Sequence, residues 1–179
     1  MNLEKLVKDI QSNDPETRTA AWQQAGPIGA PAVKPLARLY VDKDMEVRRA
    51  AKRGLEKIVR TVGMPGVQQA KSAVIRALLG LLSNSQPIAL CRDILWLLSE
   101  IAGTESVEAI AALLKHETLR EDACRVLERI PGKTSLAAIR HALRTVPEDF
   151  RLNVAQSLRA RGEAVDAKKY PCQKLVPTK

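Results

Sequence analysis

Few residues of this chain could act as nucleophiles, bases or metal ligands, and they are widely spaced. The two histidines, His116 and His141, do not accompany a Gly-x-Ser-x-Gly turn, so no nucleophile stands beside an oriented base. The cysteines Cys91, Cys124 and Cys172 form no Cys-x-x-Cys pair, and with only two histidines they give no metal-ligand spacing. The sequence therefore predicts a protein that is not an enzyme and that holds neither a metal nor another cofactor.

Asp93 and Glu100 are a pair of carboxylates that a helix would bring onto the same face. They are seven residues apart, about two helical turns. Paired acids on a hydrated helix are usually only solvated, so they indicate a surface and not a general acid and base. Trp96 stands between them, and an exposed central tryptophan is a common anchor of protein interfaces. The sequence leaves open whether the ring of Trp96 is exposed, or buried by a rotation of its helix.

The helices that must position these residues are identified by an internal repeat. The segment from Asp14 to Ala21 reads DPETRTAA, and the segment from Asp44 to Ala51 reads DMEVRRAA. In each segment an arginine follows the acid after four residues and a pair of alanines comes next, and the two segments are offset by 30 residues. Self-similarity at such a period is typical of stacked helical repeats.

The position of Ala51 recurs along the chain, at Cys91, Ala123 and Val154. Apolar residues follow these anchors after four and seven positions, as the buried face of a helix requires. The pairs are Leu55 with Ile58, Leu95 with Leu98, and Leu127 with Ile130. In the last repeat Leu158 keeps the first position, but Arg161 replaces the apolar residue at the second.

A second amphipathic helix precedes each of these, as in Val33, Leu36 and Leu39, and glycine or proline separates the pairs. We predict an all-α fold, an α-solenoid of about five antiparallel helix pairs in one domain over residues 1–162, with a longer connection near residues 61–71. The predicted repeats cover residues 1–26, 27–63, 64–103, 104–132 and 133–162. Residues 163–179 should form an extended tail, with Tyr170, Leu175 and Val176 able to pack on the last repeat.

The repeated residues resemble those of HEAT repeats, in particular the short bacterial variety first noticed in phycobilisome lyases. The resemblance covers roughly residues 2–162 and rests on the acid, the arginine and the alanine pair, as in Asp44, Arg48, Ala50 and Ala51. The third repeat departs most, with Asn84 in the position of the acid and Ile88 in that of the arginine. The fourth and fifth keep arginine but have His116 and Pro147 where the acid is expected. The resemblance implies a helical solenoid that binds other molecules.

Four arginines occupy equivalent positions of the repeats: Arg18, Arg48, Arg120 and Arg151. They could form a basic ladder for a polyanion. On a helical wheel, however, Arg48 lies about 60° from the core direction, at the seam between repeats. There its stem can lie on apolar surface and its head can pair with an acid such as Asp14 or Asp44. We therefore predict a structural role for these arginines.

The most exposed positions of each second helix should line the concave side of the solenoid, the usual binding surface of such arrays. The acidic residues at these positions are Glu16, Glu46, Glu56, Asp93, Glu100, Glu121, Glu128, Asp149 and Glu163. The basic ones are Arg49, Arg53, Arg60, Arg125 and Arg159. This mixture is not the track of one sign that phosphates require. The candidate partner-binding residues are Trp96, Asp93, Glu100, Arg49, Arg53, Glu56 and Arg125.

The net charge of +9 therefore comes mainly from the first helices, for example Lys34, Arg38 and Arg76, and from the tail. A solvated basic face is the favoured interpretation. The sequence favours a protein-binding or scaffolding module whose partner is another protein. A nucleic-acid-binding protein is an alternative supported by net charge alone. A subunit of a phycobilin-lyase-like modification enzyme is a third, which only the resemblance implies.

The start of the chain, Met-Asn-Leu-Glu-Lys-Leu, lacks the apolar core of a signal peptide. The sequence contains no stretch of about 18 apolar residues, the length that a helix needs to span a bilayer. Together with the cysteine pattern, these features predict a cytoplasmic protein with no membrane span.

Overall fold

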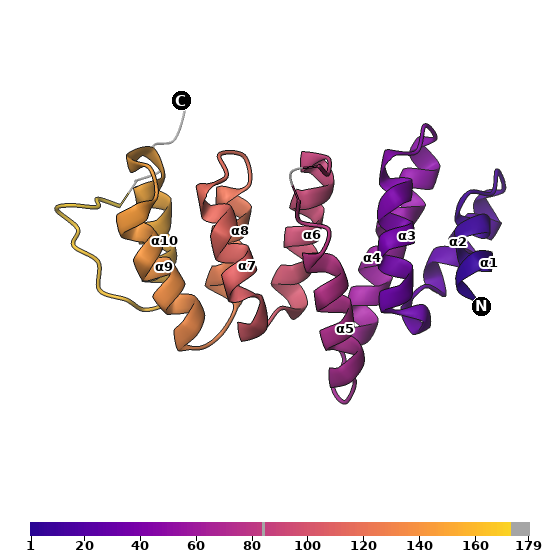
Figure 1. Ribbon diagram of the computed structural model, residues 1–179, viewed down its shortest axis with the longest axis horizontal. Helices are drawn as coiled ribbons and strands as arrows, with labels where there is room; N and C mark the ends of the chain where they lie inside the picture. The colour runs from indigo at the N-terminus through magenta and orange to yellow at the C-terminus, as the bar shows by residue number, and fades with distance from the viewer. Residues whose placement is uncertain (84, 173–179) are drawn as a thin grey trace, which may run out of the picture. The chain divides into compact units, whose positions relative to one another are not determined.

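A computed structural model describes residues 1–83 and 85–172 of the chain, and over these residues it contains ten α-helices. Their bounds are α1 Leu3–Ile10, α2 Pro15–Gln23, α3 Ala30–Arg38, α4 Met45–Val62, α5 Gln68–Leu79, α6 Ile88–Ile101, α7 Val107–Ala112, α8 Arg120–Arg129, α9 Lys133–Thr145 and α10 Arg151–Ala160. The helices follow one another as five pairs, and the predicted all-α fold of the α-solenoid class is confirmed (Figure 1). Asn84, Leu175 and Val176 lie outside the described residues.

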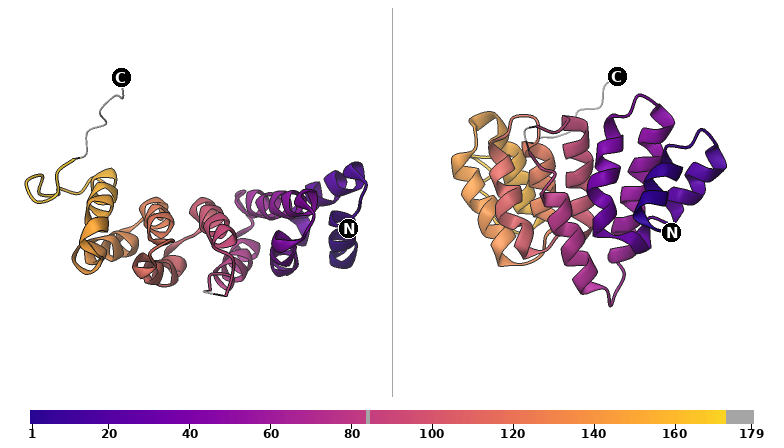
Figure 2. Two further views of the ribbon diagram at one scale, coloured as in Figure 1. Left: turned by 90° about the horizontal axis from the view of Figure 1, so that it is seen from above. Right: turned by 45° about the vertical axis from the view of Figure 1, so that its right-hand side comes forward.

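The chain divides into two compact units, Met1–Ile101 with helices α1 to α6 and Ala102–Lys179 with helices α7 to α10. In the first unit each helix packs on its partner in the pair and on the equivalent helix of the next pair, so that α1, α3 and α5 form one layer and α2, α4 and α6 another (Figure 2). In the second unit α7 packs on α9 and α8 on α10 in the same way.

The anchor of each second helix is buried completely or almost so. Ala21, Ala51, Ala123 and Val154 are 0% exposed and Cys91 is 1% exposed. A larger side chain at such a position would force neighbouring helices apart, since protein interiors are packed without spare volume. The recurrence of small residues in the sequence therefore marks the places where the layers meet.

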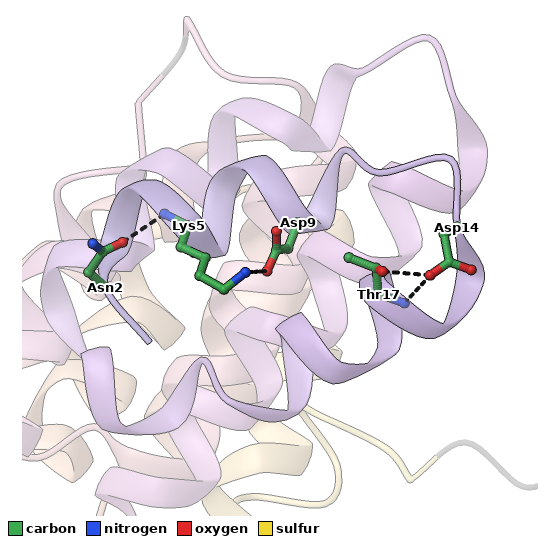
Figure 3. Close-up of polar contacts among 5 residues, drawn as sticks. All are labelled: Asn2, Lys5, Asp9, Asp14 and Thr17. Atoms are coloured by element: carbon green, nitrogen blue, oxygen red, sulfur yellow. Dashed lines mark hydrogen bonds and ion pairs between the residues drawn. The ribbon is translucent and has the colours of Figure 1, made fainter.

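The acid of the repeat signature caps the second helix (Figure 3). The carboxylate of Asp14 accepts a hydrogen bond from the backbone N–H of Thr17 at 2.9 Å and one from its hydroxyl at 2.5 Å. These bonds, the hydroxyl bond above all, hold the pKa of Asp14 below its usual value. The side chain of Asn2 caps α1 in the same way, accepting from the N–H of Lys5 at 2.8 Å. Such caps satisfy N–H groups that have no partner within the helix.

The arginines of the first two repeats have the structural role predicted for them, but their acceptors differ from the prediction. Nη1 of Arg18 donates to the main-chain carbonyl of Ser12 at 2.6 Å, and Nη1 of Arg48 donates to that of Asp42, also at 2.6 Å. Both carbonyls lie in the turn between the two helices of a pair. The predicted partner, a carboxylate such as that of Asp44, instead caps the helix that follows. Each arginine thus ties a second helix to its own turn.

In the second unit one of the equivalent arginines contacts its own turn and the other contacts the turn of the next repeat. Arg151 donates from Nε to the carbonyl of Val146 at 3.3 Å. Arg120 pairs with the carboxylate of Asp149 in the turn of the next repeat, at 2.5 Å, and stacks over the ring of Phe150. The hydrogen bond from Arg120 holds the pKa of Asp149 below its usual value.

Arg161 stands where the repeat pattern predicts an apolar residue. Its guanidinium forms hydrogen bonds with main-chain carbonyls at the end of α8. Its Nη1 donates to the carbonyl of Ile130 at 2.7 Å and to the hydroxyl of Ser135 at 3.1 Å, and its Nη2 donates to the carbonyl of Gly132 at 3.0 Å. The carbonyls of Leu127 and Glu128, at the end of α8, lie within 3.2 Å of Nη1. One guanidinium therefore satisfies carbonyl groups that the last turn of α8 leaves without partners.

We expect Arg161→Met to lower the free energy of unfolding by about 2–3 kcal/mol, because the variant keeps an apolar stem but leaves several partly buried carbonyls unsatisfied. Arg144, an exposed arginine of α9, provides the control, and Arg144→Met should change stability by less than about 0.5 kcal/mol. Urea unfolding followed by circular dichroism measures both. Equal stability of the two variants would show that Arg161 does not hold the α8–α9 turn.

Candidate functional site

An apolar groove lies between α4 and α6 in the first unit. It encloses about 430 Å³. Its lining residues are Glu56, Val59, Arg60, Gly63, Met64, Pro65, Trp96, Leu97, Glu100 and Ile101. The residues come from the C-terminal half of α4, the connection that follows it, and the C-terminal half of α6. We call this surface the α4–α6 groove.

Trp96 and Met64 are the large apolar side chains that the groove leaves in solvent. Trp96 is 49% exposed and Met64 is 57% exposed. The neighbours of Trp96 on α6 hold the helix in this orientation, since Leu95, Leu97 and Leu98 are all buried. The ring of Trp96 is therefore exposed, which settles the alternative that the sequence left open. Exposed apolar side chains gathered in one groove are typical of binding surfaces.

The connection between α4 and α5 forms one wall of the groove. It carries Met64 and Pro65 within the longer insertion predicted from the sequence. At one end a Cβ added to Gly63 would lie 3.6 Å from Cγ2 of Ile101 on α6, an ordinary van der Waals distance. At the other end Gly66 has a φ of +89°, a conformation that favours glycine. Gly66 thus allows the chain to turn after Met64 and Pro65.

Charged side chains stand around this apolar floor. Glu56 and Glu100 line the groove from α4 and α6. Arg60 lines it as well and lies 3.9 Å from the carboxylate of Glu56, one helical turn away. The side chain of Arg60 is 73% exposed, so it can move to pair with another group. The groove therefore offers an apolar centre with groups of both signs at its edge, the usual anatomy of a protein interface.

Three of the predicted binding residues make contacts beside the groove and do not line it. Asp93 pairs with Lys52 at 2.8 Å and so links α6 to α4. Burial raises the pKa of the Asp93 carboxyl in spite of this pair. Arg49 pairs with Glu46 at 2.6 Å on the surface of α4.

Arg53 is the third of these residues. Its guanidinium carbon lies 5.7 Å from the centre of the Trp22 ring, within the range of a cation–π contact. Trp22 is half-buried. The contact ties α4 to α2, so Arg53 supports the layer of second helices.

Arg125 belongs to the second unit and lines a different groove, between α8 and α10. The structure therefore brings Trp96, Glu100 and Glu56 together in one groove, but not Arg125 with them. The predicted set missed the apolar walls, above all Met64 and Pro65. A methionine and a proline between two glycines, in an insertion next to the helix of an exposed tryptophan, are the sequence signal that could have indicated them.

The thiols of the helices are buried. Burial raises the pKa of Cys91 and that of Cys124, so both favour the neutral thiol over the nucleophilic thiolate. Over residues 1–83 and 85–172, no cluster of three His, Cys, Asp or Glu side chains is placed to hold a metal ion. No helix among the same residues is both long and apolar enough to cross a membrane.

Comparisons with known proteins report similar structures but no family. No protein-family model and no curated protein matches the chain. One similar solved structure is an engineered protein, 23% identical, with a TM-score of 0.46; the match covers 89% of this chain and 79% of that one. Another is a designed armadillo repeat protein in complex with the peptide (KR)4, 17% identical, with a TM-score of 0.49, covering 87% of this chain and 80% of that one.

The effect of Asp93 on stability should depend on pH in one direction. Burial raises the pKa of Asp93 in the folded state above the usual 3.8. The protonated carboxyl therefore makes its full contribution to the free energy of unfolding below pH 3.8, and this contribution is lost as pH rises through the raised pKa. Asp93→Asn does not titrate, so its stability relative to the wild type should rise between about pH 4 and about pH 7. Urea unfolding at both pH values measures the difference. If the ion pair with Lys52 outweighed burial, the variant would lose relative stability over the same range.

Proposed function

We propose that this protein is a binding module that holds another protein through the α4–α6 groove and performs no catalysis of its own. The observation that carries the proposal is the exposure of Trp96 and Met64 in one apolar groove on a folded unit. Burying such side chains against a partner removes apolar area from water at about 25 cal/mol per Å². Tryptophan is also among the residues that most often dominate the energy of an interface.

The position of the groove supports the proposal. Trp96 and Glu100 occupy exposed positions of α6, and Glu56 occupies a half-buried position of α4 beside them. Repeat arrays commonly use the outward face of their second helices for binding. The contacts from Lys52 to Asp93 and from Arg53 to Trp22 hold α2, α4 and α6 in one layer. A groove on a rigid layer costs little conformational entropy when it receives a ligand.

We also propose that the repeats are of the HEAT type. The support lies in the repeated signature and in what its residues do. The acid caps the second helix at Asp14 and Asp44, and the arginine four residues later reaches the carbonyls of the turn at Arg18 and Arg48.

The unpaired cysteines agree with a reducing compartment, and we propose a cytoplasmic location.

We expect Trp96→Ala to weaken binding of the partner by about 30-fold or more, because a central tryptophan commonly contributes at least 2 kcal/mol to an interface. Met64→Ala should weaken it as well, and Trp96→Phe should retain part of the affinity. A pull-down from source lysate identifies proteins that the wild type retains, and titration of the purified partner measures the affinities.

Met45→Ala is the matched control, because Met45 is 49% exposed on α4 but does not line the groove. It should bind like the wild type, and circular dichroism should show that all variants are folded. If Trp96→Ala and Met45→Ala bind a partner equally, the α4–α6 groove is not the binding site. If the wild type retains only nucleic acid, released by salt, the basic surface is the functional one and the proposal is wrong.

A further inference from the structure

The first helices α3 and α5 carry basic side chains and no carboxylate. They lie in two stretches of the chain, 17–41 and 57–92, that contain no aspartate or glutamate. Their charged residues are Lys34, Arg38, Lys71 and Arg76. The two helices pack directly on each other in the layer of first helices of the first unit (Figure 2). Their positive charge therefore gathers on one layer, and no acid of either helix neutralises it.

The exposed cations lie opposite the buried face of each helix. Lys34, Arg38 and Arg76 are exposed, whereas Lys71 is half-buried. On a helical wheel, each exposed cation lies more than about 120° from the centre of the buried residues of its helix. Lys34 and Arg38 are four residues apart, so they stand one turn apart on the same side of α3. All three cations therefore lie on the outer side of the layer.

Lys34 and Arg76 occupy equivalent positions on the two adjacent helices. The sequence is AVKPL from residue 32 and VIRAL from residue 74, and in each the first, second and fifth residues are buried. Helices that pack together have their axes about 8–10 Å apart. Lys34, Arg38 and Arg76 thus form a cluster roughly 10 Å across, which we call the basic face.

No carboxylate pairs with the basic face among the residues that the structure describes. The second helices differ in this respect, because most cations of α2 and α4 already have a partner. These are Arg18, Arg48, Arg49, Lys52, Arg53 and Arg60. On the other side of α3, helix α1 carries two lysines and two carboxylates, and Lys5 pairs with Asp9. The charge of the basic face is therefore available to a ligand.

We propose that the basic face binds the phosphate backbone of a double-stranded nucleic acid. A duplex carries one negative charge per about 1.7 Å of its length, so a cluster roughly 10 Å across meets several phosphates at once. Gln69 is exposed on the same side of α5, two turns before Arg76, and adds an amide donor for phosphate oxygens. The site goes beyond the proposed function, because it lies on first helices and shares no residue with the α4–α6 groove.

The surroundings of these cations favour a phosphate backbone over a protein or a membrane. None of the large exposed apolar side chains in the described part of the chain lies on α3 or α5. The buried centre of a protein interface is apolar and poor in charged groups. A helix that binds at a bilayer surface inserts apolar side chains. Phosphate contacts need only cations and hydrogen-bond donors, and these are what the basic face offers.

The test is titration of a fluorescein-labelled DNA duplex of roughly 20 base pairs with the full-length protein, followed by fluorescence anisotropy. The affinity of the wild type should fall by about 40-fold between about 50 mM and about 200 mM salt, as three phosphate contacts require. The triple variant Lys34→Gln/Arg38→Gln/Arg76→Gln should bind about tenfold or more weakly at the lower salt concentration and lose most of the salt dependence. Undetectable binding by the wild type would overturn the proposal.

Arg49→Gln/Lys115→Gln/Arg144→Gln is the matched control, because it removes one lysine and two arginines that are exposed outside α3 and α5. It should bind the duplex like the wild type, and circular dichroism should show that both triple variants are folded. Equal losses in the two variants would mean that net charge attracts the duplex and that the basic face is no site.

Single variants of Arg38 separate charge from fold. Arg38→Lys keeps the charge and should keep the salt dependence. Arg38→Gln should reduce the slope of log K against log salt by about 0.9, the value of one phosphate contact. An equal slope in both variants would contradict a phosphate contact at this position.

Two further polyanions test the choice of partner. A polyglutamate peptide and phosphatidylglycerol vesicles replace the duplex in the same titration, and both should bind more weakly. Tighter binding of either one at the basic face would show that the partner is an acidic protein or a membrane, against the proposal. Trp96→Ala should leave duplex binding unchanged, and the basic-face triple variant should still hold the protein partner of the α4–α6 groove. Either site can therefore fail its test while the other stands.

Discussion

A single helix pair cannot bury its own apolar side chains, and every other feature of this protein depends on that constraint. Within each unit the pairs stack on one another, and the stacking places one small residue of every second helix at the meeting of the layers. Ala21, Ala51, Cys91, Ala123 and Val154 are accordingly almost inaccessible to solvent. Because each buried anchor sets the rotation of its helix, it also determines which residues of that helix face outward.

The same rotation builds both grooves. The residue five positions after the anchor lines a groove in each of the last four repeats: Glu56, Trp96, Glu128 and Arg159. In the third repeat that position holds an apolar ring beside Met64, and in the fifth it holds the guanidinium of Arg159, which donates to the carbonyl of Tyr170. One repeated geometry therefore presents different side chains in each repeat, because the positions that line the grooves are free to vary while the anchors are not.

Several charged side chains of this fold form hydrogen bonds with main-chain groups. Arg18 and Arg48 satisfy carbonyls of turns, Arg161 satisfies the end of α8, and Asp14 satisfies N–H groups at the start of α2. Short helices leave many such groups without partners, since four at each end have none within the helix. These arginines of the second helices therefore have a structural role.

The sequence by itself determined the helix pairs, their order and the buried face of each second helix, because periodicity and recurring small residues report local and nearest-neighbour packing. It also indicated the outward side of the second helices, which carries Trp96, Glu56 and Glu100. Only the tertiary structure decided that the Trp96 ring is exposed, that Met64 and Pro65 form a wall beside it, and that Asp93, Arg49 and Arg53 make other contacts. Those outcomes depend on the course of a connection and on which side chains meet between helices. Neither of these produces a periodic pattern in the sequence.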